Sequence, residues 1–222
     1  MCPRRLESAA LRDRLAVYYV ADPEQTERDF MTLVSDALAG GVTALQLRAK
    51  RMDGRGMFEL ACWMRVQCEQ ADALFFVNDR VDIALAAGAD GVHVGTRDLP
   101  LDATRQLVGD AMLIGYSPLT MAEVLSAKPD GADYVGLGPV FATGSKPDAQ
   151  APLGLSGLAD QAKAANLPSV AIGGIEIAMA GEVIRAGVDG VAVVSAIQRA
   201  ADPKQAVAAL AHEVNLAKME RS

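Results

Sequence analysis

Three polar residues, Gln46, Arg48 and Lys50, stand at alternate positions at the end of an apolar run. Side chains at alternate positions of a β-strand point the same way, so an amide and two cations are expected to converge where this strand ends. Such a group could neutralise a phosphate or a diphosphate. The pattern leaves one alternative open, a solvated salt-bridge edge, because exposed charge pairs often have no larger role.

Two carboxylates, Asp79 and Asp98, each follow an apolar run that predicts a strand. Magnesium is commonly bound through one or two protein carboxylates and completes its shell with phosphate oxygens and water. Beside Arg48 and Lys50, these two residues would form a site for a metal-bound phosphorylated ligand. Helix-capping or turn aspartates are the alternative, and they are common where strands lead into helices.

A further polar group lies in the segment 138–147, which places Thr143, Gly144, Ser145 and Lys146 directly after another apolar run. Two hydroxyls, a flexible glycine and a cation are suited to clamping a phosphate. The stretch continues to Gly154 without a helical pattern. It is expected to be either a lid over the site or an irregular surface loop.

The elements that must position these residues repeat along the chain. Four similar segments join a helix-ending glycine to an apolar strand, at intervals that fit two βα units: 39–48, 87–95, 130–138 and 186–195. Four further apolar runs lie between them, at 15–20, 74–77, 112–115 and 169–174. Eight such runs, separated by helix-compatible sequence, predict an α/β fold, a single closed (β/α)₈ TIM barrel, with an open doubly wound sheet as the alternative.

A barrel separates residues for chemistry from residues for stability, because active sites lie at the carboxyl ends of the strands. Asp90, Asp133 and Asp189 precede their strands and are expected at the opposite, stabilising rim. Gly174 and Ser195 follow the seventh and eighth strands, whose loops commonly form the phosphate site of this fold. A phosphate-binding position is therefore expected there.

The 222 residues fit one barrel domain, predicted at 15–218 after an N-terminal extension of residues 1–14. The extension lacks an apolar signal core, no run reaches the roughly 20 apolar residues that span a bilayer, and the three cysteines have no metal or disulfide spacing. A cytoplasmic protein is expected. The net charge of −7 argues against nucleic acid as a partner but not against small phosphorylated ligands, and a homo-oligomer is left open.

The chain resembles the thiamine-phosphate synthase family, which also contains the thiazole tautomerases, over roughly residues 15–212. The resemblance rests on an ordered set of segments: QLRAK, NDRVDIALAAGADGVHVGTRDLP, GADYVGLGPVFATGSKPDA, AIGGI and GVAVVSAI. It implies a transferase that condenses 4-amino-5-hydroxymethyl-2-methylpyrimidine diphosphate with a thiazole phosphate, carboxylated or not, to give thiamine phosphate and diphosphate. A dissociative path fits, because the electron-rich aminopyrimidine can stabilise the cation left behind.

The resemblance also implies roles for residues at matching positions. The pyrimidine diphosphate would be held by Gln46, Leu47, Arg48, Ala49, Lys50, Asn78, Ser117 and Lys146, of which Arg48, Lys50, Ser117 and Lys146 would take part in catalysis. Asp79 and Asp98 would bind Mg²⁺, the implied cofactor. The thiazole phosphate would be held by Thr143, Gly144, Ser145, Gly174, Val194 and Ser195.

Two other functions remain open beside the synthase. A thiazole tautomerase-like isomerase predicts an acid or base after the fifth strand, where relatives often carry a histidine two residues after the serine and this chain has Leu119. A non-catalytic regulatory relative that binds thiamine intermediates should have lost members of the metal and diphosphate set, yet all are present. His93, within a predicted strand, is expected to be structural.

Overall fold

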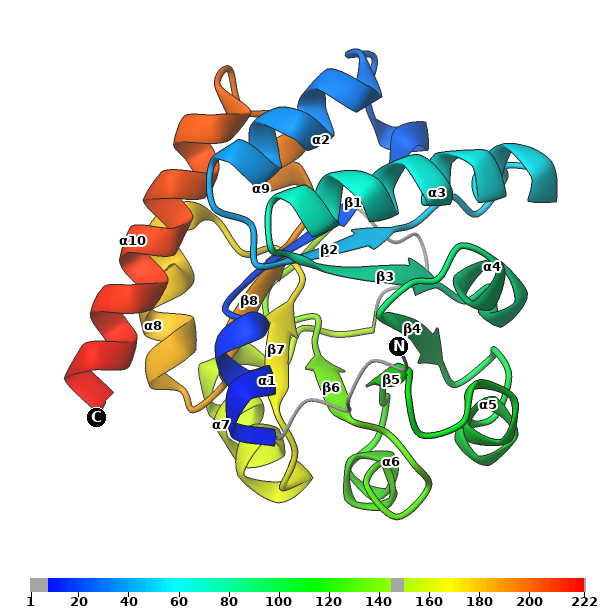
Figure 1. Cartoon of the computed structure of the whole chain (residues 1–222). Coiled ribbons are helices and arrows are strands. Elements are labelled where there is room, and N and C mark those ends of the chain that lie inside the picture. The colour runs from blue at the N-terminus through cyan, green and yellow to red at the C-terminus, as the bar shows by residue number, and fades with distance from the viewer. Residues whose placement is uncertain (1–7, 145–149, 222) are drawn as a thin grey trace.

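Eight short parallel strands form a sheet that closes on itself in the computed structural model, which describes residues 8–144 and 150–221 (Figure 1). The strands are β1 (Val17–Ala21), β2 (Ala44–Leu47), β3 (Leu74–Asn78), β4 (Gly91–Gly95), β5 (Leu113–Ser117), β6 (Tyr134–Leu137), β7 (Ser169–Ile172) and β8 (Gly190–Val193). β1 pairs in parallel with both β2 and β8. The closed (β/α)₈ barrel is confirmed, and the open doubly wound sheet is wrong.

Helices surround the barrel and join successive strands (Figure 1). They are α1 (Ser8–Arg14), η1 (Pro23–Gln25), α2 (Phe30–Ala39), α3 (Gly54–Gln70), α4 (Val81–Ala86), α5 (Leu101–Val108), α6 (Met121–Ser126), α7 (Gly154–Ala165), η2 (Ile177–Met179), α8 (Ala180–Arg185), α9 (Ser195–Gln198) and α10 (Pro203–Arg221). The helix α1 precedes the first strand, and its Leu11 packs into the same apolar cluster as the barrel interior. The predicted extension 1–14 therefore contributes to the core from Ser8 onward.

The four repeated segments are the turns that lead from a helix into an even-numbered strand. Their glycines, Gly41, Gly88, Gly131 and Gly187, have φ of 104°, 64°, 108° and 112°. Residues other than glycine are strained at such positive φ, so glycine is needed at these positions for the chain to reverse within a few residues. The repeats therefore mark the start of β2, β4, β6 and β8.

The rim where the strands begin is held by side chains from the same four turns. In each, a side-chain oxygen at the start of an even-numbered strand accepts a hydrogen bond, of 2.8 or 2.9 Å, from a backbone N–H of the preceding strand: Thr43 from Val17, Asp90 from Phe75, Asp133 from Ile114 and Asp189 from Ser169. The three aspartates also pair with arginines, Arg65, Arg105 and Arg12 respectively. Their predicted place at the stabilising rim is confirmed.

Large and small residues alternate inside the barrel. The rings of Tyr18, Phe76 and Tyr134 pack together with centroids 5.3 to 6.1 Å apart. A Cβ atom at Gly91 would overlap the Phe76 ring, and one at Gly115 would overlap the Tyr134 ring. Close packing of this kind fills the barrel below its open end, so a ligand can enter only at the mouth.

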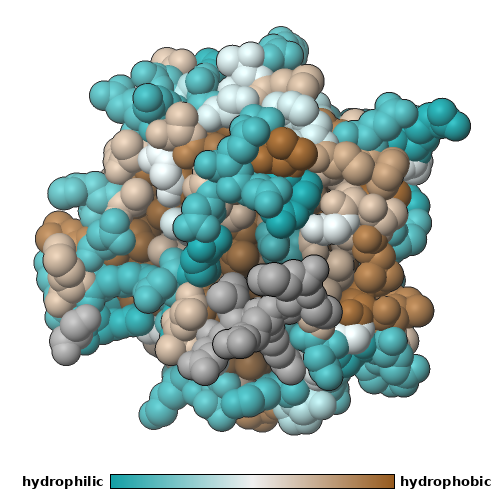
Figure 2. Space-filling view, viewed as in Figure 1, coloured by the Kyte–Doolittle hydropathy of each residue, from teal (hydrophilic) through white to brown (hydrophobic). Residues whose placement is uncertain are grey.

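A second apolar layer lies between the strands and the helices. Helix α3 contributes Met57, Ala61, Met64 and Cys68 to this layer. Helix α6 begins with a capping box formed by Thr120 and Glu123. The face of the molecule in Figure 2 is mainly hydrophilic, with its apolar side chains in separate groups. Throughout the part of the chain described here, every helix is too short or too polar to span a bilayer.

Candidate active site

A cavity of about 390 Å³ opens among the carboxyl ends of the strands. Ends of parallel barrel strands meet at one rim, so residues far apart in sequence are brought to the same opening. The residues predicted from the sequence that line this cavity are Gln46, Arg48, Lys50, Asn78, Asp79, Asp98, Ser117, Thr143, Gly174, Val194 and Ser195.

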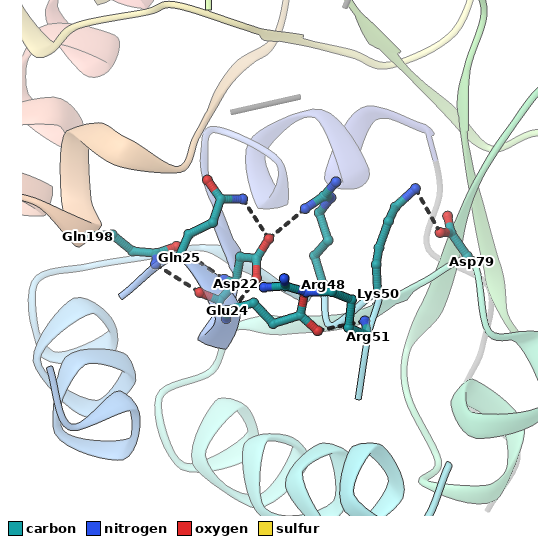
Figure 3. A network of polar contacts seen from close by, with 8 residues as sticks. All are labelled: Asp22, Glu24, Gln25, Arg48, Lys50, Arg51, Asp79 and Gln198. Atoms are coloured by element: carbon teal, nitrogen blue, oxygen red, sulfur yellow. Dashed lines mark hydrogen bonds and ion pairs between the residues drawn. The ribbon is translucent and has the colours of Figure 1, made fainter. Parts of the chain in front are cut away.

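The alternating residues after β2 lie as the strand pattern predicts. Gln46 is buried within the barrel, and its Nε2 donates to the Tyr18 hydroxyl at 2.9 Å. Arg48 and Lys50 extend in the same direction from the end of the strand (Figure 3). Arg48 Nη1 contacts Asp22 Oδ2 at 2.5 Å, and Lys50 Nζ lies 3.3 Å from Asp79 Oδ2. Both cations are therefore held at the mouth by carboxylates.

Asp79 and Asp98 form a neighbouring pair of carboxyl groups. Asp79 directly follows β3 with φ of 62°, and Asp98 turns back so that its Oδ2 accepts from the backbone N–H of Gly95 at 2.8 Å. The pKa of Asp79 is raised, first because the group is partly buried and second because Asp98 is close, while Lys50 opposes the rise. Two carboxyl groups that repel each other in this way are suited to sharing a cation.

The donor set at this position fits magnesium. Among the described residues no cluster of three or more His, Cys, Asp or Glu side chains could hold a metal ion. Asp79 and Asp98 offer two oxygen donors in the cavity, beside open space that a phosphorylated ligand and water can fill. Magnesium prefers such a site, with few protein carboxylates and several exchangeable oxygens, whereas zinc prefers three or four nitrogen or sulfur ligands.

A chain of hydrogen bonds crosses the floor of the cavity. The Tyr18 hydroxyl lies 2.7 Å from that of Tyr134, and the Tyr134 hydroxyl lies 2.9 Å from His93 Nδ1. His93 Nε2 in turn lies 2.8 Å from Ser117 Oγ. Because Gln46 donates to Tyr18, this chain links Gln46 on one side of the cavity to Ser117 on the other. Both ends have a fixed orientation before any ligand binds.

The far side of the cavity is built from β6, β7 and β8. The loop after β6 runs along the end of β7, where the N–H groups of Val140 and Phe141 donate to Ile172 and Gly173 at 3.0 and 2.9 Å. A Cβ at Gly174 would overlap the backbone of this loop, so only glycine allows the close approach. Thr143 is thereby brought to the cavity beside Gly174 and Ser195. Hydroxyls and exposed backbone of this kind suit a phosphate.

Comparison with known families agrees with this arrangement. A family model described as "Thiamine monophosphate synthase" matches residues 17–197, which include all eight strands, from β1 to β8. The chain belongs to the thiamine monophosphate synthase family. It is therefore an enzyme, a transferase of the thiamine-phosphate synthase type.

Individual relatives show how far the likeness to the thiamine monophosphate synthase family extends. The chain is 53% identical over 190 residues to a thiamine-phosphate synthase of Laribacter hongkongensis, covering 85% of this chain and 90% of the relative. It is 48% identical over 191 residues to that of Moorella thermoacetica, covering 86% and 91%. A thiamine phosphate pyrophosphorylase structure from Pyrococcus furiosus matches with TM-score 0.86 and 40% identity, covering 93% of this chain and 98% of that one.

Three residues that the family resemblance assigns to substrate are described but do not line the cavity, and two more are not described. Leu47 and Ala49 are buried against the surrounding helices, so only their backbone could reach a ligand. Gly144 is exposed beside Thr143 but does not line the cavity. Ser145 and Lys146 fall outside the described residues. The roles assigned to all five stay predictions.

The sequence alone missed several polar residues of the site. Asp22 contacts Arg48, and Gln25 and Gln198 hydrogen-bond to Asp22. Tyr18 and Tyr134 carry the hydrogen bonds below the cavity. The tyrosines stand inside apolar runs and are indistinguishable there from packing residues. Asp22 has one signal, because an aspartate directly before a proline typically starts a helix, and it does accept from the Glu24 N–H of η1 at 2.9 Å.

Separate observations argue against each of the two rival functions. Leu119 lines the cavity after β5 with an apolar side chain, so no acid or base stands at the position where an isomerase would carry one. His93 is 8% exposed, and both its ring nitrogens are hydrogen-bonded, as expected of a structural histidine, although it also lines the cavity. Membership in a family of enzymes argues against a non-catalytic relative.

Proposed function

We propose that the chain condenses 4-amino-5-hydroxymethyl-2-methylpyrimidine diphosphate with a thiazole phosphate, releasing diphosphate and forming thiamine phosphate. The observation that carries the proposal is the division of one cavity into two sides. Arg48, Lys50, Asp79 and Asp98 gather on one side, while Thr143, Gly174 and Ser195 lie among the loops of the other. The first set suits a metal-bound diphosphate and the second suits a monophosphate.

On the diphosphate side, the protein's work is to neutralise the negative charge that grows as the diphosphate departs. Arg48 can donate to non-bridging oxygens with the N–H groups that Asp22 does not occupy, and Lys50 supplies a mobile ammonium group. Asp79 and Asp98 would hold Mg²⁺, which would add a positive charge beside the leaving group. Lys146, predicted from the family resemblance, would add a further cation.

The chemistry needs no nucleophile from the protein, and the cavity supports a route without one. Departure of diphosphate leaves a cation that the aminopyrimidine ring stabilises, and the thiazole nitrogen then captures it. Gln46 and Ser117, which are fixed by their hydrogen bonds, would orient the pyrimidine ring. The packed barrel interior beneath these residues would keep the pyrimidine ring from entering more deeply. The residues would therefore act mainly by aligning the two substrates.

The test is product formation from the two phosphorylated substrates, with and without Mg²⁺, followed as thiamine phosphate and released diphosphate. Metal-dependent appearance of both products in equal amounts is expected. The assay should be run with the carboxylated and the uncarboxylated thiazole phosphate in competition, because the ratio of products assigns the preferred form. Folded protein that binds either substrate but forms no product with either thiazole would refute the proposal.

A further inference from the structure

Asp22 is a buried acidic residue behind the cavity lining, in contact with the lining residues Arg48 and Gln25, and the family resemblance does not assign it. It follows β1, and its side chain is only 1% exposed. Its carboxylate accepts three hydrogen bonds: from Arg48 Nη1 at 2.5 Å, from Gln25 Nε2 at 2.6 Å and from the Glu24 N–H at 2.9 Å. A buried carboxylate held by three donors has little freedom to move.

Gln198 fixes the backbone of Asp22 from the other end of the chain. Its Oε1 accepts from the Asp22 N–H at 3.1 Å, and its Nε2 donates to the Asp22 carbonyl at 2.9 Å. Gln198 is itself buried, with 3% exposure, and ends the short helix α9 that starts at Ser195. Figure 3 shows the resulting series of contacts, from Gln198 through Asp22 to Arg48.

The neighbouring cation is held in a different way. The side chains of Lys50 and Asp79 are 49% and 24% exposed, whereas those of Arg48 and Asp22 are 12% and 1% exposed. The Lys50 contact is longer, at 3.3 Å, and lies where solvent can replace either partner. Arg48 therefore has a permanent partner, while Lys50 has one that it can exchange when a ligand arrives.

We propose that Asp22 is a positioning residue that holds Arg48 extended over the cavity, and that Gln198 holds Asp22 in place. The identity of the ligand as a diphosphate rests on the proposed function. A free arginine side chain loses rotamer freedom when it binds a phosphate, and a fixed partner removes that cost in advance. Asp22 occupies one Nη of the guanidinium, which leaves the other N–H donors to bind the ligand.

Binding of inorganic pyrophosphate with Mg²⁺, measured by calorimetry, tests the proposal without requiring turnover. Asp22→Asn keeps the size of the side chain but loses the charge that holds Arg48. We expect affinity to fall about tenfold, the size of one displaced charge-assisted hydrogen bond. In an Arg48→Gln background the same change should shift affinity by less than about twofold, because its effect passes through Arg48.

Glu24→Gln is the matched control. Glu24 stands on the same turn as Asp22 and pairs at 2.9 Å with Arg51, which lies with Arg48 on the segment after β2. Arg51 is 79% exposed, however, and the pair lies outside the cavity lining. This variant should bind pyrophosphate like the wild type. If Glu24→Gln lost as much pyrophosphate affinity as Asp22→Asn, removal of any charge from this turn would have the same effect. That result would overturn the assignment of Asp22 as a positioning residue.

Gln198→Met provides a second variant should Asp22→Asn fail to fold. It should raise the KM for the pyrimidine diphosphate and leave the KM for the thiazole phosphate unchanged, whereas a merely structural lesion would lower kcat through a smaller active fraction. Wild-type KM values in Gln198→Met, additive effects of Asp22→Asn and Arg48→Gln, or no pyrophosphate binding by the wild type would each overturn the proposal. Wild-type protein that binds pyrophosphate but forms no product would refute only the proposed function.

Discussion

Asp79 gives the most direct test of the metal site at the residue scale. Its raised pKa reflects burial first and repulsion from Asp98 second, and a cation would relieve both. Asp79→Ala is expected to lower kcat by on the order of 10²-fold or more. Without this carboxylate the site would no longer hold the Mg²⁺ that balances the charge of the departing diphosphate. Steady-state kinetics over a range of Mg²⁺ concentrations measure the effect.

The control for this variant is Asp102→Ala, on the exposed face of α5 and away from the cavity. It should retain wild-type kinetics, and both variants should give wild-type circular dichroism spectra. Unchanged turnover in folded Asp79→Ala would contradict the magnesium assignment.

Tyr134 tests the hydrogen-bonded chain beneath the cavity. Tyr134→Phe keeps the aromatic packing but removes the hydroxyl that contacts both Tyr18 and His93. We expect a loss of about 1 to 3 kcal/mol in the free energy of unfolding, because buried polar groups lose a partner. Urea denaturation measures it, and Tyr116→Phe, near the protein surface and less buried, should change stability by less than about 0.5 kcal/mol. Equal unfolding free energies of the two variants would contradict a stabilising role for the hydrogen bonds through Tyr134.

Strand geometry explains which site residues the sequence could predict. Alternation along β2 is local, so the sequence alone placed Gln46, Arg48 and Lys50 on one side. The role of Asp22 depends on Gln198, which stands 176 positions away and reaches it only because the barrel closes. A contact of that kind follows from closure of the whole sheet and has no local pattern to reveal it.

The turn aspartates belong to the scale of the elements, since each ties two strands together. Asp133 accepts from the Ile114 N–H at 2.8 Å and from Arg105 at 2.5 Å, with its side chain 6% exposed. Asp133→Ala should destabilise the fold by about 2 to 3 kcal/mol, because it leaves the buried Ile114 N–H without its acceptor and the partly buried Arg105 without its carboxylate partner. Urea denaturation should show this, while kcat per folded molecule stays unchanged because the residue lies at the rim opposite the cavity.

Asp130→Ala is the comparison for that prediction. Asp130 is exposed and close in sequence, so its loss should change the unfolding free energy by less than about 0.5 kcal/mol. A large loss of kcat in Asp133→Ala, measured on fully folded protein, would show that the two rims are not separate in function.

Strands were predictable from the sequence where a local pattern marked both the end of a helix and the start of the strand that follows it. The glycine turns gave the even-numbered strands, because positive φ ends a helix and starts a strand within a few residues. For the loop after β6 the sequence predicted a phosphate clamp and left open whether the segment is a lid or an irregular surface loop. Its course depends on hydrogen bonds to Ile172, the last residue of β7, and to Gly173, the residue after it. Both lie far downstream in the sequence, so the loop's own residues do not reveal these contacts.

The pH dependence of stability is a property of the whole molecule, because its strongly shifted groups lie throughout the core. Burial raises the pKa of Tyr18, Tyr19 and Tyr134, and raises the pKa of the Cys68 thiol to about 12. The folded state therefore keeps these protons at a pH where the unfolded chain releases them. Their contribution is complete below the unfolded pKa values, near 8.5 for cysteine and 10 for tyrosine, and is lost as pH rises beyond them.

Unfolding free energies measured in urea from pH 7 to pH 11 should therefore decline, with a slope that steepens above about pH 10. Each group that is protonated only in the folded state contributes about 1.4 kcal/mol per pH unit. Tyr134→Phe removes one such group, so the slope of its unfolding free energy against pH should be smaller by the contribution of that one group. This change in slope is separate from the lower stability expected of the variant at pH 7. Absorbance at 295 nm gives an independent measure, since tyrosinate should form together with unfolding. Tyrosinate from these buried residues near pH 10 in protein that remains folded would contradict the linkage, because the folded state would then release the same protons as the unfolded chain.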